Sequence, residues 1–301
     1  MKLEGIHHIT AITGDAPANV RFYADLLGLR LVKKTVNQDD PTVYHLFYAD
    51  ELGSAGADLT FFEYPGAGRG RAGAGMVHRI VWRVASEQAL DFWVVRLEAA
   101  GVSADRAPGS LRFADPEALE LELFVEETTD EPLVARHPEI PAEHALQGFA
   151  GVRAYASDPE RSRRFLEQTL GFEPGFEVNG DHRQGSYIYD APPDGSGAGG
   201  AGTVHHVAFA STLADHPAWR ARAAEAGAQP TPIIDRFYFR SVYFREPSGV
   251  LLEIATIGPG FTTDEPLEPL GKRLSLPPDF ESRRERLEGV LTPLPSPRRE
   301  T

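Results

Sequence analysis

The sequence of 301 residues contains no cysteine. This absence excludes disulfide bonds, thiolate zinc sites and a cysteine nucleophile. No apolar run approaches the roughly 20 residues that a membrane-spanning helix needs, and the first residues contain no apolar segment of a signal peptide. We therefore expect a cytoplasmic protein with no membrane partner.

An excess of basic residues is also missing, since 30 Lys and Arg stand against 44 Asp and Glu, for a formal net charge of −14. An acidic surface repels phosphate backbones, which argues against nucleic acid as a partner. The hydrophobic content of 42% and the charged content of 25% are typical of a globular chain that buries an ordinary core.

What is present is an internal repeat. The segment HITAITGD at residues 8–15 resembles GVRAYASD at 151–158, and MVHRIVW at 76–82 resembles TVHHVAF at 203–209. Each segment begins as an alternating strand, and each is followed by a helical pattern and then by further strands. The repeat predicts an α+β fold of four βαβββ modules, at about residues 5–64, 75–125, 148–190 and 202–257.

The modules group into two halves, with residues 1–130 holding modules 1 and 2 and residues 145–260 holding modules 3 and 4. The acidic linker 126–147 contains three prolines and is expected to be irregular. The proline-rich tail, 261–301, contains one predicted helix around Asp279–Gly289. It is expected to pack on the surface or at a contact between copies in a homo-oligomer.

Two glycine-rich segments, 68–73 and 197–202, fit the pattern GxGxxG. A dinucleotide site needs a helix directly after the glycines, so that the helix N-terminus can bind pyrophosphate. A strand pattern follows both segments, and both lie between modules. We interpret them as flexible linkers rather than phosphate-binding loops.

Two histidines and one glutamate occupy strand positions of modules 1 and 4 that suit metal binding. His8 lies on the first strand of module 1, His206 has the matching place in module 4, and Glu253 lies on the last strand of module 4. A lone histidine is more often structural, but two imidazoles and one carboxylate form the facial set that suits Fe(II) and leaves positions open. The three residues are therefore the predicted metal ligands.

The other two modules lack this set at the equivalent positions. Gly151 stands where module 1 has His8, and Arg79 stands where module 4 has His206, while Glu122 alone matches Glu253. An arginine supplies the charge that a metal would otherwise provide. We expect a second site without metal, in which Arg79 and Arg112 neutralise Glu122.

The hairpin around Ser248 places Tyr243 directly opposite Glu253, and the hairpin around Glu117 pairs Arg112 with Glu122 in the same way. Tyr243 is thus predicted to lie beside the metal as an acid, base or hydrogen-bond donor. A purely packing role is the alternative. His45 could line the cavity, but we interpret it as a structural histidine.

Four motifs together resemble a known family: GIHHIT at residues 5–10, YHLFYADE at 44–51, VHHV at 204–207 and SVYFREPSG at 241–249. The pattern resembles the ring-cleaving, hydroquinone-type extradiol dioxygenases of the vicinal oxygen chelate superfamily, also called the glyoxalase/bleomycin resistance/dioxygenase superfamily. The resemblance covers about residues 5–257. It implies that the modules form two open β-barrel-like cups. Because the predicted ligands come from modules 1 and 4, these two modules pair and modules 2 and 3 pair.

The resemblance also implies roles for single residues. His8, His206 and Glu253 would bind Fe(II), with Mn(II) as the alternative metal. Five further residues would lie near the substrate, with Tyr243, His205 and His7 as catalytic groups and Arg236 and Thr10 as substrate-binding groups. Strand alternation places Thr10 on the same face as His8 but His7 on the opposite face.

The implied reaction is cleavage of a small aromatic ring, of hydroquinone or catechol type, with insertion of O₂. Two other classes use the same scaffold. Glyoxalase-type lyases and isomerases employ a metal as a Lewis acid without O₂, and antibiotic-binding proteins need no metal ligands. The three predicted ligands argue against the binding protein, and the two histidines favour iron chemistry over the lyase.

Overall fold

The predicted order of strand, helix and further strands occurs four times in the computed structural model, which describes residues 1–296. Module 1 contains β1 (Ile6–Thr13), α1 (Ala16–Val20), the π-helix η1 (Arg21–Leu26), β2 (Arg30–Val36), β3 (Tyr44–Ala49) and β4 (Asp58–Glu63). Module 2 contains β5 (Met76–Val84), α2 (Glu87–Ala99), β6 (Ala104–Ala107), β7 (Ser110–Ala114) and β8 (Glu120–Val125).

Module 3 contains β9 (Phe149–Tyr155), α3 (Glu160–Arg164), the π-helix η3 (Phe165–Leu170), β10 (Glu177–Asn179) and β11 (Gln184–Asp190). Module 4 contains β12 (Val204–Ser211), α4 (His216–Glu225), β13 (Ile234–Asp235), β14 (Arg240–Arg245) and β15 (Leu251–Thr256). The linker holds one short 3-10 turn, η2 (Ala142–His144), so its predicted irregular course is confirmed.

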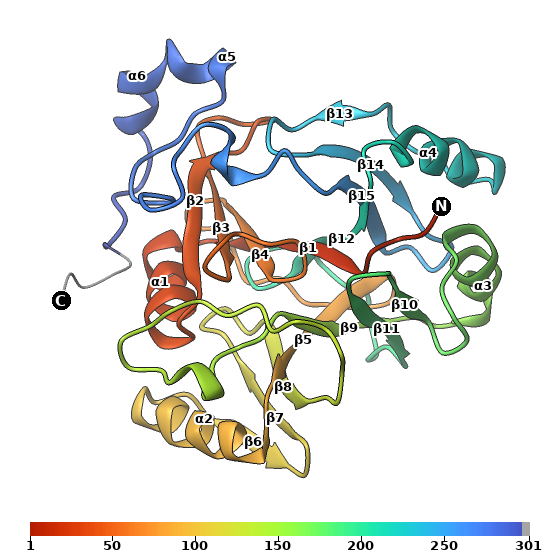
Figure 1. The fold of residues 1–301 in the computed structure, drawn as a ribbon, viewed down its shortest axis with the longest axis horizontal. Helices are drawn as coiled ribbons and strands as arrows, with labels where there is room; N and C mark the ends of the chain where they lie inside the picture. Colours follow the sequence, from red (N-terminus) through yellow and green to blue (C-terminus); the bar gives the residue numbers. More distant parts are fainter. Residues whose placement is uncertain (297–301) are drawn as a thin grey trace.

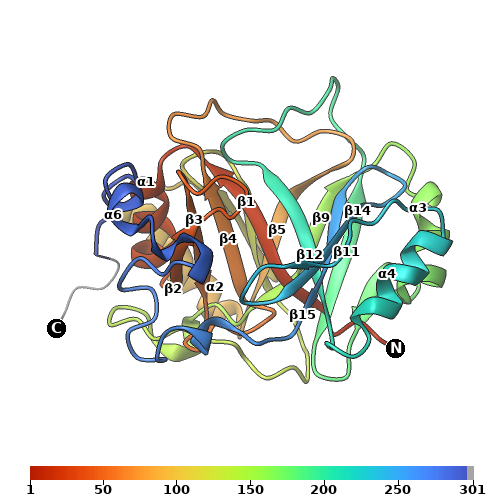
Figure 2. The same cartoon turned by 90° about the horizontal axis from the view of Figure 1, so that it is seen from above.

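The strands form two sheets, and each sheet joins modules that are not consecutive in the chain (Figures 1 and 2). The eight-stranded sheet has the order β13-β14-β15-β12-β1-β4-β3-β2 and therefore combines modules 4 and 1. The seven-stranded sheet has the order β10-β11-β9-β5-β8-β7-β6 and combines modules 3 and 2. The predicted pairing of modules is confirmed, and module 3 contributes one strand fewer after its helix.

The helices of modules 1 and 3 end alike, but α3 has Pro159 as its N-cap and no side-chain cap. Asp15 accepts a hydrogen bond from the backbone N–H of Ala18, which caps the first helix. Both helices finish in a π-helical turn and are followed by a glycine with positive φ, Gly28 at 74° and Gly171 at 77°. In Figure 2 the helices lie at the two ends of the molecule, with the strands between them.

The tail covers an edge of the eight-stranded sheet that would otherwise be exposed. Backbone bonds join it to β2, the last strand of the eight-stranded sheet, with Ser275 N–H donating to the carbonyl of Lys34. A covered edge cannot pair with another chain. Within residues 261–296 the tail forms the 3-10 turn η4 (Phe261–Thr263) and two short helices, α5 (Pro278–Glu281) and α6 (Arg284–Glu288), so the expectation of one helix around Asp279–Gly289 was wrong.

The two glycine-rich segments pair with each other, forming the loops at the top of Figure 2. Bridges join Arg69 to Ala201 and Arg71 to Ala198, and a Cβ added at Gly70 would lie only 2.7 Å from the backbone nitrogen of Gly200. A strand follows each segment, β5 and β12 respectively. The arrangement lacks the helix that a dinucleotide site requires, and it agrees with the prediction of linkers.

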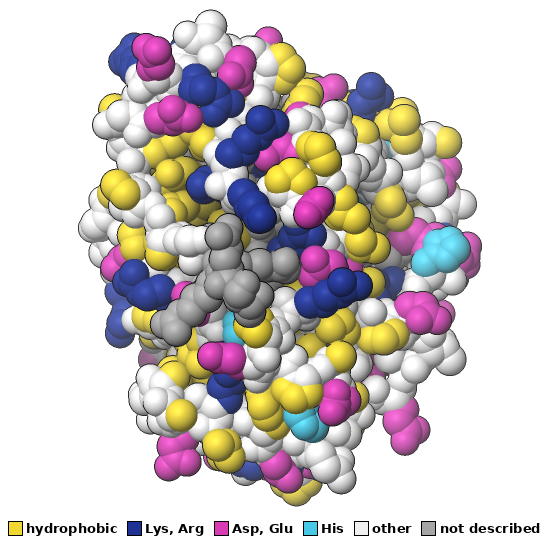
Figure 3. Space-filling view, turned by 60° about the vertical axis from the view of Figure 1, so that its left-hand side comes forward, with side chains coloured by type: hydrophobic (Ala, Val, Ile, Leu, Met, Phe, Trp, Pro, Cys, Tyr) yellow, Lys and Arg dark blue, Asp and Glu magenta, His cyan; other side chains and the backbone are white. Residues whose placement is uncertain are grey.

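Within residues 1–296 no helix has both the length and the apolar character that crossing a membrane requires. On the face seen in Figure 3, acidic and basic side chains are intermixed.

A buried carboxylate joins the helix of module 1 to the last hairpin of module 2. Asp115 accepts hydrogen bonds from the backbone N–H groups of Glu117 and Leu119, and from the hydroxyl of Tyr23 at 3.0 Å. Modules 3 and 4 are joined by a similar contact, in which the hydroxyl of Ser162 donates a hydrogen bond to Glu246. Burial raises the pKa of Asp115 to about 6, although these hydrogen bonds oppose the rise.

This raised pKa predicts a pH dependence of stability. The native state binds a proton at Asp115 more tightly than the unfolded state, so the stabilisation is complete below about pH 4 and is lost as pH rises to about 6. Asp115→Asn should keep the bonding geometry, because its amide can accept from the backbone and donate to Tyr23. We expect the difference in unfolding free energy between wild type and D115N to fall by up to about 3 kcal/mol across that range in urea titrations. Parallel stability curves would contradict the assignment.

Candidate metal centre

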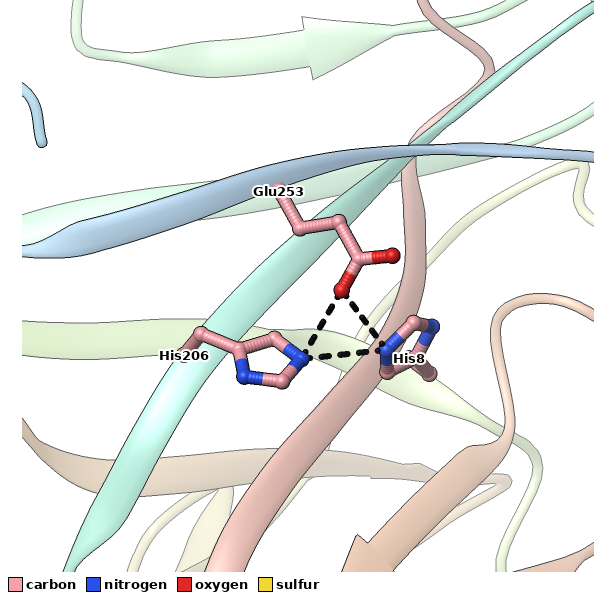
Figure 4. A group of neighbouring side chains, drawn as sticks. All are labelled: His8, His206 and Glu253. Atoms are coloured by element: carbon pink, nitrogen blue, oxygen red, sulfur yellow. Dashed lines mark hydrogen bonds and ion pairs between the residues drawn. The ribbon is translucent and has the colours of Figure 1, made fainter. Parts of the chain in front are cut away.

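The side chains of His8, His206 and Glu253 meet at one point of the eight-stranded sheet (Figure 4). They come from β1, β12 and β15, which are neighbours at the centre of the sheet. His8 Nε2 lies 3.2 Å from His206 Nε2 and 3.2 Å from Glu253 Oε2, and His206 Nε2 lies 2.9 Å from the same oxygen. The sequence predicted this convergence.

The spacing of the three donor atoms fits a metal with an open face. Three ligands at about 2.1 Å from an ion are about 3.0 Å apart on an octahedral face and about 3.4 Å apart at tetrahedral angles. The observed separations of 2.9, 3.2 and 3.2 Å fall in the range of these two geometries. The donor set of two imidazoles and one carboxylate is also the one that non-haem Fe(II) uses.

The burial of the cluster supports the same reading. Glu253 is 0% exposed, and its Oε1 has no hydrogen-bond partner in the described part of the chain. Burial alone would raise its pKa, but His8 and His206 outweigh burial and hold the pKa of Glu253 well below its usual value. Burial lowers the pKa of His206, which keeps that imidazole neutral with a lone pair free for a cation.

The first histidine of each doublet lies at a β-bulge. In the pairing of β1 with β12, Ile6 faces Phe209 and His8 faces Ala208, so His7 is an extra residue on its strand. His205 is the extra residue on β12, by the same shift in register. A bulge redirects side chains locally. The expectation from regular alternation, that His7 faces away from the site, is therefore wrong.

Each doublet joins its two imidazoles through their Nδ1 atoms, at 2.9 Å for His7 and His8 and at 2.8 Å for His205 and His206. The carbonyl of Thr256, 3.2 Å from His7 Nε2, must accept, so His7 carries its proton on Nε2. His7 Nδ1 then accepts from His8 Nδ1–H, and the lone pair of His8 Nε2 is left for the metal. This orientation of a metal-binding histidine by a neighbour is common in metal sites.

Both supporting histidines are neutral. Burial lowers the pKa of His7 to about 3, and the neighbouring His8 lowers it further. Burial lowers the pKa of His205 to about 4, again with a contribution from its neighbour, His206. A neutral imidazole can accept the hydrogen bond that an imidazolium cannot, so both can accept from the ligand histidine, and the Thr256 carbonyl fixes this direction for His7.

A cavity of about 430 Å³, which includes its opening to solvent, adjoins the cluster at His206. Tyr243 lines it and pairs with Glu253 across β14 and β15, as predicted, with its ring 5.4 Å from the ring of His206. Burial raises the pKa of Tyr243, and Glu253 adds to the rise, so the phenol keeps its proton.

Arg236 also lines the cavity, but its guanidinium is already bound. It donates to both oxygens of Asp39, at 3.1 and 3.0 Å, and lies over the ring of Tyr243 at 5.6 Å from its centre. Gln38 donates to the carbonyl of Arg236 at 2.7 Å. The loop after β2 and the loop after β13 are thus tied together beside the cavity.

Thr10 and His45 have places that differ from their sequence interpretation. Thr10 is fully buried, and its hydroxyl bonds that of Thr60 at 2.8 Å rather than forming part of the cavity wall. His45 is in the cavity wall, with Nε2 at 2.9 Å from the same Thr60 hydroxyl. The alternation of residues along β3 was the sequence signal available for His45. A prediction that His45 lines the cavity also requires the register of β3 against β4.

The pseudo-twofold axis between modules 1 and 4 defines a fourth ligand position. Glu253 pairs with Ala208, two residues after His206, and Thr60 pairs with Thr10, two residues after His8. Thr60 therefore occupies the place in module 1 that Glu253 occupies in module 4. A neutral hydroxyl is a weak ligand, so the cluster has three strong donors and an open side.

The second, equivalent location in the seven-stranded sheet is filled by charge pairs, as predicted. Arg79 Nη1 lies 3.1 Å and Arg112 Nε 3.4 Å from the carboxylate of Glu122, and Arg112 pairs with Glu122 in register. A Cβ added at Gly151 would lie 2.1 Å from Ser186 Oγ, so a histidine has no room there.

Comparisons with known proteins cover nearly the whole chain. The model of the Glyoxalase/Bleomycin resistance protein/Dioxygenase superfamily matches residues 5–123 and 148–254. A Bacillus subtilis protein named "Putative ring-cleaving dioxygenase MhqE" is 39% identical over 98% of this chain and 100% of that protein.

A second relative and a solved structure agree with this result. The chlorohydroquinone/hydroquinone 1,2-dioxygenase of Sphingobium indicum is 32% identical over 95% of each protein. A Bacillus subtilis crystal structure, described as that of a "putative dioxygenase", has a TM-score of 0.90 at 38% identity and covers 100% of this chain and 99% of its own. The likeness therefore includes the tail as well as the four modules.

Proposed function

Because the chain belongs to the Glyoxalase/Bleomycin resistance protein/Dioxygenase superfamily, we propose that it is a ring-cleaving dioxygenase that inserts O₂ into a hydroquinone-type aromatic ring. Its metal ligands are His8, His206 and Glu253, and its metal is Fe(II), with Mn(II) as the alternative. Catechol-type rings are the poorer substrates.

One observation carries this proposal beyond the family level: the fourth, symmetry-related ligand position is Thr60. A metal ion held by these three donors would keep positions open on one side for a substrate oxygen and O₂. An Fe(II) ion there would supply the one-electron chemistry that ground-state O₂ requires. The sequence relatives with dioxygenase names support the same reaction class.

The other residues of the proposed site bind, orient or move protons. His7 and His205 fix the tautomers of the two ligand imidazoles through their Nδ1 contacts. Tyr243 holds a proton beside Glu253 and is the proposed acid during ring opening. Arg236, bound to Asp39, holds the phenol of Tyr243 in place, so its proposed contact with substrate requires the Asp39 pair to open.

The test is metal analysis of protein purified without oxygen, followed by measurement of O₂ uptake with hydroquinones and catechols. We expect iron to co-purify, O₂ uptake to match product formed, and activity lost in air to return with Fe(II) and a reductant. Product formation under strict anaerobiosis, or activation by Zn or Ni alone, would instead support a glyoxalase-type lyase. The cytoplasmic location and the homo-oligomer remain predictions from the sequence.

A further inference from the structure

His45 and Tyr243 line the same cavity from opposite sides. In the sheet order, β14 with Tyr243 and β3 with His45 lie on opposite sides of the strands that carry the metal-binding cluster. The imidazole packs against two phenylalanine rings, with centroids 4.0 Å from Phe47 and 4.4 Å from Phe62. This packing fixes the orientation of the ring.

A short hydrogen-bond chain holds the inner nitrogen of His45. Its Nε2 lies 2.9 Å from Thr60 Oγ1, and Thr60 Oγ1 lies 2.8 Å from Thr10 Oγ1. Both threonines are 0% exposed. The structure gives no further hydrogen-bond partner to either hydroxyl within residues 1–296.

The number of protons available to the hydrogen bonds between His45, Thr60 and Thr10 selects the tautomer of His45. If Nε2 carried a proton and donated to Thr60, then one of the two buried threonine hydroxyls would have no acceptor, and buried donors are rarely left unpaired. If Thr10 donates to Thr60 and Thr60 donates to Nε2, both hydroxyls are satisfied. The imidazole then carries its proton on Nδ1.

Nδ1 of His45 is the open donor of this wall. No hydrogen bond to Nδ1 occurs among the described residues, and Nδ1 is not one of the fully buried atoms without a partner, so it keeps some accessible surface on a residue that lines the cavity. Two other polar groups of the lining already have partners: Arg236 bonds Asp39, and the hydroxyl of Tyr238 donates to Asp264 at 3.0 Å.

We propose that His45 forms a second-oxygen subsite, in which Nδ1–H donates to the phenolic oxygen of the substrate that is not bound at the metal-binding cluster. Thr60 and Thr10 act as positioning residues, since they set the tautomer of His45 without touching the substrate. Burial lowers the pKa of His45 well below its ordinary value, so the group acts as a neutral donor rather than as a cation. The subsite rests on the proposed function, because it requires an aromatic substrate with two oxygens.

The first test compares two ligands and two matched variants of the Fe(II)-loaded protein without oxygen. Hydroquinone has the second oxygen, and phenol lacks it. His45→Gln keeps a polar atom near Thr60 but removes the donor at the Nδ1 position, whereas His45→Asn keeps an amide at the Nδ1 position and loses the contact with Thr60. We expect the hydroquinone-to-phenol affinity ratio, measured by calorimetry, to fall about fivefold to tenfold in H45Q, the size of one neutral hydrogen bond.

In H45N the ratio should stay closer to that of wild type, and the affinity for phenol should be similar in all three proteins. Equal loss of affinity for both ligands in H45Q would show a structural role and overturn the subsite. If wild type cleaves hydroquinone with O₂ but the ratio is unchanged in H45Q, only the assignment of His45 fails. If wild type binds no hydroquinone, the proposed function and the subsite both fail.

The second test does not depend on the substrate. In ¹⁵N NMR spectra of the zinc-loaded protein, we expect His45 to be protonated on Nδ1 and unprotonated on Nε2. Thr60→Val, which removes the hydroxyl that donates to Nε2, should shift the proton towards Nε2. An Nε2-protonated His45 in the wild type would overturn the proposed proton order.

Discussion

Replacing Thr60 by glutamate is expected to abolish ring cleavage, with a loss of at least about 10²-fold in turnover, the effect of removing an essential catalytic feature. Thr60 occupies the place related to Glu253 by the pseudo-twofold axis, because each pairs with the residue two positions after a ligand histidine. A carboxylate there would provide a fourth strong ligand and close the open side of the cluster. Metal analysis should show equal or tighter binding of the ion, although the activity is gone.

Thr60→Gln is the matched control, because glutamine has the same size and is a much weaker ligand than glutamate. Thr60 is fully buried, so both variants crowd the site equally and both break the bond to His45. We expect T60Q to keep more turnover than T60E and to bind metal no more tightly than wild type. Equal inactivation without any gain in metal affinity would show that crowding, rather than ligation, is the cause.

The metal-binding cluster could be predicted from the sequence because the repeat carries the information. Equivalent positions in equivalent modules lie at equivalent places in a pseudo-symmetric fold, so His8 and His206 had to approach each other once modules 1 and 4 paired. The short hairpin at Ser248 fixed the register of Tyr243 against Glu253 in the same way. Each of these inferences needed only local geometry and the symmetry of the repeat.

The residues that sequence reasoning misplaced depend on non-local register. His7 was assigned to the wrong face because regular alternation fails at a β-bulge, and the bulge arises where β1 meets β12, almost two hundred positions away. Thr10 and His45 are joined only through Thr60, so their roles follow from how β1, β4 and β3 align. The residue pattern within a single strand does not determine how that strand aligns with its neighbours.

Replacing Tyr243 by phenylalanine should lower turnover by about 10²–10⁴-fold, the usual range for a lost acid–base group. The phenol keeps its proton because burial and Glu253 raise its pKa, and it is held by the guanidinium of Arg236. The variant removes only the hydroxyl, and Tyr243 is not a ligand, so metal content and affinity for hydroquinone should remain near wild type.

Tyr238→Phe supplies the matched control for this prediction, because Tyr238 lines the same cavity but its hydroxyl donates to Asp264 at 3.0 Å. Losing that bond should destabilise the fold by about 1 kcal/mol and leave turnover within a few-fold of wild type. Steady-state and single-turnover rates of O₂ consumption would separate the two variants. If Y243F and Y238F lose turnover to the same extent, the loss reflects packing of the cavity wall. If Y243F keeps full turnover, the proton that opens the ring comes from another group. The neutral donor proposed at His45 is then the first to test, because His45 lines the same cavity.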